Sequence, residues 1–192
     1  MTSERPAVEP GLLSSRALDA LLELAWATVQ ALVRGRPLPR LPEDPELAAP
    51  RGVFVSLHRE GALRGCLGRL EPDLPVGEAV RRMAVASSRD DPRFPPVAPD
   101  ELEGLEVEVS VLSPAVRISA GDVVPGRDGL IVQRGPRMGV LLPQVAVEQG
   151  WDRTAFLRGV CQKALLPADA WRDGDTELYA FQAQVVPGRA DR

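Results

Sequence analysis

Three segments of the chain place apolar residues every three or four positions, the spacing that buries one face of a helix. We predict that the first helix begins at Ser14 or Ser15, either of which can cap it, and ends near Gly35. The second is predicted over residues 76–89, and the third over about 152–165. The periodic apolar positions of the first helix are Leu18, Leu21, Leu22, Ala25, Val29 and Leu32.

Other segments have the length and the β-branched content of strands. The predicted strands are residues 53–57, 63–69, 105–112, 130–133, 138–142 and 178–186. Short turns join two pairs of them, at Glu60-Gly61 and at Arg134 to Arg137, so we predict two hairpins. Hairpins separated by isolated helices indicate an α+β fold, with a mostly antiparallel sheet flanked by helices.

The remaining segments are predicted to be irregular. Residues 1–13 are expected to be a disordered leader, and residues 36–50 and 90–99 are connections rich in proline. None of these connections is long enough to force a domain boundary. We therefore predict a single domain over residues 14–187.

Composition and charge exclude several classes of protein. The 192 residues carry a net charge of −4, which disfavours a dedicated nucleic-acid binder, and no apolar run reaches the roughly 18 residues of a membrane span. The first residues do not resemble a signal peptide, which indicates a cytoplasmic protein without a disulfide. Cys66, Cys161 and the single His58 cannot form a four-ligand zinc site. We predict no metal and no cofactor.

The segment LRGCLG, residues 63–68, contains the first candidate site residues. Residues two apart in a strand share a face, so Arg64 and Cys66 are expected to point the same way. A nearby guanidinium favours the reactive thiolate over the thiol. Gly65 and Gly68 leave room for a ligand or for another backbone. In the alternative interpretation, Cys66 packs as a small apolar residue and the glycines mark a bulge or a packing contact.

The predicted hairpin register separates His58 from Cys66. With the turn at Glu60-Gly61, His58 is expected opposite Leu63, and Cys66 opposite Val55 on the other face. A Cys–His pair is therefore not expected, because the two groups would lie beyond hydrogen-bond reach.

Two further segments contain candidate residues. In DPRFPP, residues 91–96, the prolines stiffen the backbone and can hold Asp91 and Arg93 at the edge of a binding site. The alternative is a stiff surface crossing with Phe94 in the core. Lys163 is the only lysine among 23 basic residues, and an ammonium can titrate or form a Schiff base, which a guanidinium cannot. The alternative for Lys163 is chance retention with its amine in water.

Six segments in this order resemble the AMMECR domain family. They are LRGCLG (63–68), DPRFPP (91–96), LEVEVSVLSP (105–114), GLIVQRG (129–135), LLPQV (141–145) and CQKALL (161–166). The resemblance covers residues 17–186 and implies a two-lobed α+β fold in which the LRGC segment lines a cleft between the lobes. The positions that match the family motifs are Arg64, Gly65, Cys66 and Gly68 in the first motif, Asp91, Pro92, Arg93, Phe94 and Pro96 in the second, and Lys163 in the last.

The resemblance also implies partners, although it supplies no reaction. Prokaryotic members of the family are known as the A component of the Amme–Memo–RadiSam system, which implies Memo-type and radical-SAM proteins. The family pattern usually reads LRGCIGT, whereas this chain has Leu67 and Arg69 at the fifth and seventh positions. Arg69 removes a hydroxyl and adds a cation near Cys66. The sequence leaves open whether the chain forms a homodimer.

Three hypotheses of function follow. The first is a module that binds a ligand or a partner in a Cys66-lined cleft, favoured because no complete pair of base and nucleophile is visible. The second is an enzyme with Cys66 as the nucleophile, Arg64 assisting it, and Arg93 or Lys163 binding an anionic group. The third, RNA binding, rests on the eight arginines between residues 51 and 93 and comes last, because no aromatic stacking platform accompanies them.

Overall fold

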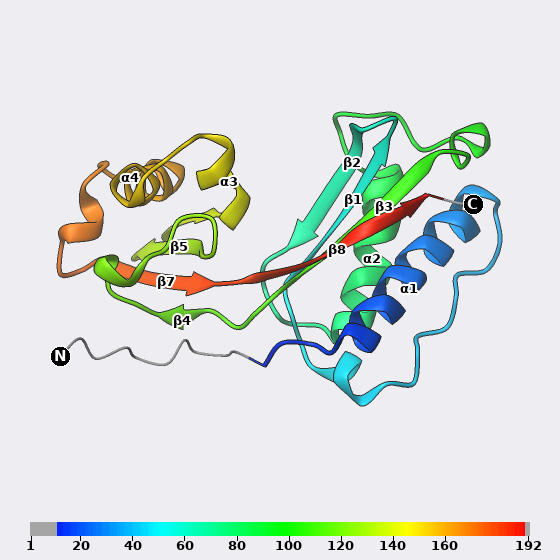
Figure 1. Cartoon of the computed structure of the whole chain (residues 1–192), viewed down its shortest axis with the longest axis horizontal. Coiled ribbons are helices and arrows are strands. Elements are labelled where there is room, and N and C mark those ends of the chain that lie inside the picture. The colour runs from blue at the N-terminus through cyan, green and yellow to red at the C-terminus, as the bar shows by residue number, and fades with distance from the viewer. Residues whose placement is uncertain (1–10, 191–192) are drawn as a thin grey trace. The chain divides into compact units, whose positions relative to one another are not determined.

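The computed structural model describes residues 11–190, which divide into two units. Unit 1 comprises residues 11–112 and 184–190, and unit 2 comprises residues 113–183. Each unit contains one four-stranded sheet together with helices (Figure 1). The α+β class predicted from the alternation of hairpins and isolated helices is confirmed.

Unit 1 packs two helices against one face of a sheet with the strand order β2-β1-β3-β8. Its elements are α1 (Ser15–Val33), the 3-10 helix η1 (Pro45–Ala48), β1 (Val53–Arg59), β2 (Ala62–Arg69), α2 (Val76–Arg89), the 3-10 helix η2 (Pro99–Glu101), β3 (Leu105–Leu112) and β8 (Ala183–Ala190). β1 pairs antiparallel with both β2 and β3. β2 therefore lies at one edge of this sheet.

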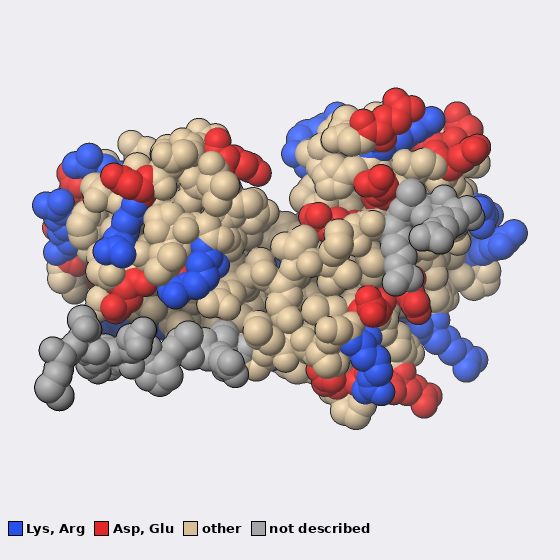
Figure 2. All heavy atoms as spheres, in the orientation of Figure 1, with Lys and Arg blue, Asp and Glu red and all other residues tan. Residues whose placement is uncertain are grey.

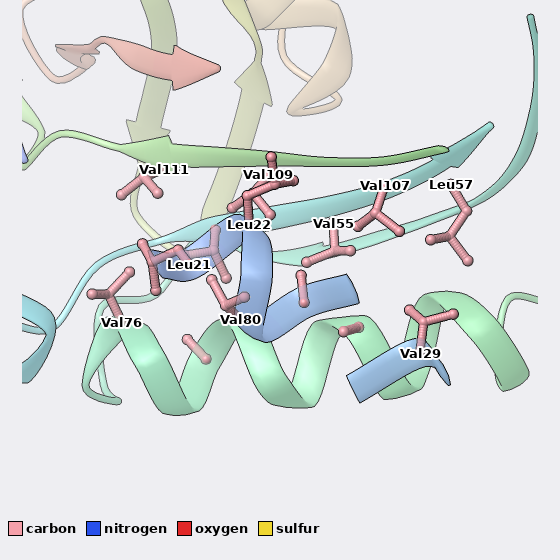
Figure 3. Packing of buried hydrophobic residues seen from close by; sticks show 14 of the residues in the cluster. Leu21, Leu22, Val29, Val55, Leu57, Val76, Val80, Val107, Val109 and Val111 are labelled. Atoms are coloured by element: carbon pink, nitrogen blue, oxygen red, sulfur yellow. The ribbon is translucent and has the colours of Figure 1, made fainter. Parts of the chain in front are cut away.

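The core of unit 1 lies between the helices and the sheet. Figure 3 shows side chains of α1 and α2 directed toward the strands, and strand side chains directed toward the helices. Among the buried residues there are Leu21, Leu22, Val29, Val55, Leu57, Val76, Val80, Val107, Val109 and Val111. Leucine and valine fill this core as their alternating and helical spacings predict.

Unit 2 is built on a sheet with the order β4-β7-β5-β6. Its elements are β4 (Val116–Arg117), the 3-10 helix η3 (Ala120–Asp122), β5 (Gly129–Arg134), β6 (Arg137–Leu141), α3 (Pro143–Glu148), α4 (Arg153–Lys163), the 3-10 helix η4 (Ala170–Arg172) and β7 (Glu177–Phe181). Phe156, Leu157 and Val160 of α4 are buried together with Leu130 and Val132 of β5. The short elements β4 and α3 were not predicted.

The helix starts agree with the local signals in the sequence. The Ser14 hydroxyl accepts a hydrogen bond from the amide of Ala17 at 3.2 Å, and the Asp152 carboxylate accepts one from the amide of Ala155 at 2.8 Å. Each bond satisfies an amide that has no partner inside the helix. α2 begins and ends at the predicted residues.

The predicted leader is described in part. Residues 1–10 lie outside the described residues, so the prediction of disorder there stays a prediction. Leu13 is only 7% exposed, and its backbone exchanges two hydrogen bonds with the side-chain amide of Gln184, at 2.8 and 3.0 Å. Leu13, just before the first helix, is therefore packed within unit 1.

The prediction of one strand over residues 178–186 is wrong. The segment forms β7 and β8, which belong to different sheets. Between them, the amide of Gln182 donates to the Ser113 hydroxyl at 2.9 Å, and the amide of Ser113 donates to the Gln182 carbonyl at 2.8 Å. The alternation of apolar residues continues through this break, so the pattern could not mark it.

The predicted register of the first hairpin is correct at one end and wrong at the other. His58 lies opposite Leu63 as predicted, but Cys66 lies opposite Ser56 and not Val55. A β-bulge between Leu57 and His58 shifts the register, because β2 contributes one more residue than β1 there. Ser56 and His58 are two apart in β1, so Cys66 shares a face with both.

The glycines of LRGCLG are explained by close packing within unit 1. A Cβ atom at Gly65 would overlap the carbonyl oxygen of Ser87 in α2, and one at Gly68 would overlap the ring of Phe54. Another backbone therefore lies against Gly65, and an aromatic side chain against Gly68. Helix α2 can approach β2 this closely only because residue 65 has no side chain.

We expect Gly65→Ala to lower the free energy of unfolding by about 1–3 kcal/mol, because the added methyl group meets backbone and not a flexible side chain. Urea denaturation of the purified protein measures the change. Gly77→Ala in α2 is the matched control: a Cβ there has only ordinary contacts, so stability should be kept or raised. Equal stability of the two variants would contradict this account of Gly65.

Candidate functional site

Cys66 lies on the edge strand β2 with its thiol half-buried and free. The hydroxyl of Ser56, its neighbour on β1, donates to the Cys66 sulfur at 3.2 Å. Glu108 lies opposite Ser56 on β3. A thiol, a hydroxyl and a carboxylate thus form a row across three strands, on the face opposite the one that Val55 and Leu57 turn toward the helices.

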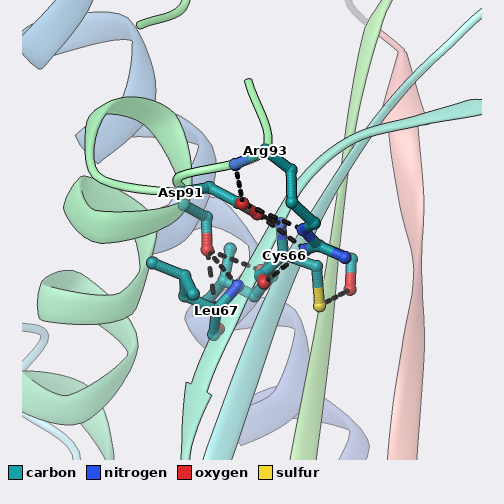
Figure 4. Close-up of polar contacts among 7 residues, drawn as sticks. Cys66, Leu67, Asp91 and Arg93 are labelled. Atoms are coloured by element: carbon teal, nitrogen blue, oxygen red, sulfur yellow. Dashed lines mark hydrogen bonds and ion pairs between the residues drawn. The ribbon is translucent and has the colours of Figure 1, made fainter. Parts of the chain in front are cut away.

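The carboxylate of Asp91 fixes the backbone of Cys66 (Figure 4). Asp91 is 3% exposed and accepts the Cys66 amide at 2.8 Å and the Arg93 amide at 3.1 Å. The guanidinium of Arg93 adds two bonds to the same carboxylate, at 2.9 and 2.7 Å, and donates to the Cys66 carbonyl at 3.0 Å. Both backbone groups of Cys66 are therefore bound by one loop.

These bonds explain the acidity of Asp91. Hydrogen bonds from Arg93, together with the Cys66 amide, hold the pKa of this carboxyl well below its usual range, although burial acts in the opposite direction. The buried group is consequently a stable anion at neutral pH. Its charge is compensated by Arg93, whose side chain is 53% exposed.

Ser87, in the last turn of α2, connects the two strands beside Cys66. Its buried hydroxyl donates to the Val55 carbonyl at 2.7 Å and accepts the Leu67 amide at 2.9 Å. Val55 and Leu67 are partners in the β1–β2 register, so the hydroxyl bridges two backbone groups of neighbouring strands. Helix α2 thus holds this part of β2 in place through one side chain.

Arg64 is bound by Glu101 and not by the thiol. Its Nε and Nη2 donate to the two carboxylate oxygens of Glu101 at 2.7 and 2.8 Å, and Nη2 also donates to the Pro96 carbonyl at 3.3 Å. Arg64 lowers the pKa of Glu101 to about 2 by these bonds. This bidentate pairing reduces the positive charge that Arg64 can offer to Cys66.

The ring of Phe94 lies between the two motif arginines. The guanidinium carbons are 5.9 Å (Arg64) and 5.5 Å (Arg93) from the ring centroid, within the range of cation–π attraction. Phe94 is half-buried. It therefore connects the DPRF loop to Arg64 of β2 and is not fully buried in the core, which was one of the two alternatives predicted for this segment.

The structure brings six of the predicted site residues together in unit 1, namely Arg64, Gly65, Cys66, Gly68, Asp91 and Arg93. Lys163 is the exception, since it is an exposed residue at the end of α4 in unit 2. Its predicted role stays a prediction. Cys161, in the same helix, is a free and buried thiol whose pKa is raised by burial.

Sequence reasoning missed four polar residues of the site: Ser56, Ser87, Glu101 and Glu108. Ser56 would follow from the correct register, which depends on the bulge. Glu101 and Glu108 belong to an acidic run that is typical of a solvated face. His58 shares the face of Cys66 but is offset by two residues, about 7 Å along the strand, and no hydrogen bond joins the two among the described residues.

The arginines that suggested RNA binding are engaged within unit 1. Seven of the eight between residues 51 and 93 form ion pairs, namely Arg59, Arg64, Arg69, Arg81, Arg82, Arg89 and Arg93. Arg51 donates to the Gly11 carbonyl at 2.7 Å. Figure 2 shows acidic and basic side chains next to one another on much of the face in view. This arrangement differs from the basic stripe of a nucleic-acid binder.

The described residues also bear on membrane and metal sites. None of the helices in residues 11–190 is both long enough and apolar enough to cross a membrane. Within the same residues, no group of three His, Cys, Asp or Glu side chains is arranged to hold a metal ion.

Comparison with known proteins gives one consistent family. The sequence model of the AMMECR1 family matches residues 22–186. A protein of Methanothermobacter thermautotrophicus is 45% identical over 86% of this chain and 91% of its own length. Protein TK0174 of Thermococcus kodakarensis is 44% identical over 87% of this chain and 88% of its own. The crystal structure of protein PH0010 from Pyrococcus horikoshii is similar with a TM-score of 0.78 and 42% identity, over 90% of this chain and 92% of that one.

We expect Asp91→Asn to lower the free energy of unfolding by about 2–3 kcal/mol at pH 7, because an amide cannot accept all the donors that the buried carboxylate accepts. The pKa of Asp91 is lowered in the folded state, so its contribution is complete above about pH 5 and is lost as the pH falls below about 4. The difference between wild type and variant should therefore shrink in acid.

Urea denaturation at pH 7 and near pH 3 measures this change. The control is Asp90→Asn, since Asp90 is an exposed neighbour that pairs only with the adjacent Arg89. That variant should unfold at the same urea concentration as wild type. A difference for Asp91→Asn that stays constant with pH would show that the carboxylate charge is unimportant.

Proposed function

The chain belongs to the AMMECR1 family, and we propose that it is a binding module whose Cys66 face holds a ligand or a segment of a partner protein. The observation that carries this proposal is the immobilised backbone of Cys66, tied by Asp91 and Arg93 at its amide and its carbonyl. A group held on both sides is preorganised to receive a ligand at low entropic cost.

The charges around Cys66 favour binding over catalysis by an activated thiol. Arg64 and Arg93 each make two bonds to a carboxylate, so neither is a free cation beside the sulfur. Arg59 and Arg64 pair with Glu101, and Arg93 pairs with Asp91, while Glu108 adds a third carboxylate to the row that contains Cys66. Among these cations the Arg93 side chain is 53% exposed, so it is the one that an anionic group on the ligand can reach.

Memo-type and radical-SAM proteins are the first partners to test, since the family resemblance implies them. In this proposal such a partner binds the chain directly, with the Cys66 face of unit 1 as the contact surface. The residues that would carry recognition are Ser56 and Arg93, because these are exposed in part and fixed by hydrogen bonds, whereas Cys66 contributes packing.

We expect Cys66→Ala and Cys66→Ser to bind a purified Memo-type protein within about threefold of wild type, because packing and not thiolate chemistry is required of the residue. Arg93→Gln should weaken binding by about tenfold or more, since it removes the exposed cation. Isothermal titration calorimetry measures both. Arg89→Gln, an exposed arginine of the same unit, is the control and should bind like wild type.

Circular dichroism and thermal unfolding must show that each variant is folded. A folded Cys66→Ala protein that no longer binds would count against a purely packing role for the thiol. No binding of wild type to either a Memo-type or a radical-SAM protein would remove these partners from the proposal.

One observation favours a second candidate, an enzyme with a Cys66 nucleophile. The Ser56 hydroxyl donates to the sulfur, which stabilises a thiolate over a thiol, and Glu108 lies opposite Ser56 on β3, where its carboxylate could take up the thiol proton. The thiolate would then attack an electrophilic centre of an anionic substrate. Glu108 would then be the general base that the sequence alone did not identify.

Alkylation by iodoacetamide at pH 7 separates the two candidates. The binding module predicts that Ser56→Ala and Glu108→Gln change the rate of Cys66 alkylation by less than about twofold. The enzyme predicts that both variants slow it about tenfold or more, because Ser56→Ala removes the hydrogen-bond donor that stabilises the thiolate and Glu108→Gln removes the base. Glu106→Gln, on the same face of β3 but opposite His58, is the matched control for the loss of a charge.

A further inference from the structure

Leu165 has a backbone conformation and an exposure that are unusual for an apolar residue. Its φ is +57°, in the left-handed region, and its side chain is 82% exposed. Left-handed backbone costs an L-residue free energy, and glycine is the usual residue at this place after a helix. Because the leucyl side chain is exposed, it gains no free energy of burial on folding that would offset this cost.

The conformation is set by the end of α4. The Leu165 amide donates to the Gln162 carbonyl at 2.9 Å, and the Leu166 amide donates to the Cys161 carbonyl at 2.9 Å. These two bonds define a Schellman motif in which Ala164 is the C-cap and Leu166 packs into the core. The motif requires the left-handed backbone of residue 165, and it directs that side chain into solvent.

Two cations accompany the exposed leucine. Arg137, near the tip of the β5–β6 hairpin, donates from Nη1 to the Leu165 carbonyl at 3.0 Å, which joins the hairpin to the helix end. Lys163 is exposed two residues before Leu165. Within residues 11–190 neither cation forms an ion pair, whereas four other arginines of unit 2 do, namely Arg117, Arg127, Arg134 and Arg158.

We propose that Arg137, Lys163 and Leu165, here called the Leu165 surface, are a docking site for a folded partner protein that offers an apolar pocket with carboxylates at its rim. Burial of the leucyl side chain in the pocket regains the free energy that the left-handed backbone costs. The partner's carboxylates pair with Arg137 and Lys163, which form no ion pair within the described residues of this chain. The surface shares no residue with the Cys66 site and does not depend on the function proposed for it.

Two other occupants of the Leu165 surface are alternatives to a partner protein. One leucyl side chain with two cations is too small an anchor for stable attachment to a lipid bilayer. A second copy of this chain would have to provide an apolar pocket beside free carboxylates; exposed acidic residues such as Asp100 and Glu103 of unit 1 make this the alternative that the crosslinking experiment below must separate from a partner.

The first experiment locates the partner. A photocrosslinking amino acid is introduced at residue 165, or at Val147 as the control, which is another exposed apolar residue of unit 2. We expect an adduct in cells that forms from residue 165 and not from residue 147. The absence of any such specific adduct would overturn the proposal, and so would an adduct with a second copy of the chain.

The second experiment measures the contribution of the side chain with the captured protein after purification. We expect Leu165→Gly to weaken binding about tenfold or more, although the variant should unfold about 2–4 °C higher than wild type because glycine relieves the backbone strain. Lys163→Glu should also weaken binding, and salt should weaken the binding of wild type. Val147→Ala should bind like wild type.

The gain in stability distinguishes two explanations of weaker binding by Leu165→Gly, namely loss of the contact with the partner and unfolding of the variant. A variant that is more stable than wild type does not lose binding because it unfolds. Equal binding by Leu165→Gly and wild type would overturn the proposal. A third experiment measures cosedimentation of the protein with vesicles of phosphatidylglycerol and phosphatidylcholine. Vesicle binding by wild type that Leu165→Gly abolishes would overturn the proposal and assign the Leu165 surface to a membrane.

Discussion

A buried carboxylate must replace its water with hydrogen-bond donors from the protein, and this requirement organises the edge of the sheet in unit 1. Asp91 meets it with the amide of Cys66 and with the amide and guanidinium of Arg93. β2 is an edge strand, so its outward backbone groups would otherwise be left to solvent. The pairing therefore provides hydrogen-bond partners both for the buried carboxylate and for the outward backbone groups of Cys66. In this way it fixes the position of the Cys66 backbone, from which the thiol extends.

Helix α2 contributes to the same position from the other side. Ser87 in its last turn bridges Val55 and Leu67, and its carbonyl oxygen occupies the space that a side chain at residue 65 would need. Asp91 follows the helix by two residues. A displacement of this helix end would therefore move both supports of Cys66 together, which links the packing of the core to the geometry of the candidate site.

Local signals were sufficient to predict much of the fold. The caps at Ser14 and Asp152 and the turn at Glu60-Gly61 are decided by neighbouring residues, and the structure has them where they were predicted. The β-bulge and the break at Gln182 depend on pairing with distant segments, so the sequence pattern passed over both. For the site, the family motifs indicated Cys66, Asp91 and Arg93. The partners of these residues, such as Ser56 and Glu101, required the register and the path of the loop.

The order of segments along the chain also constrains how the protein is made. Unit 2 is inserted into unit 1, whose fourth strand β8 follows unit 2 in the chain. During synthesis, β1, β2 and β3 leave the ribosome well before β8 does. In that interval β3 is itself an edge, with backbone groups that can pair with another chain. The inserted unit can complete its own sheet first, so the nascent protein passes through a stage in which one half is finished and the other still exposes a strand.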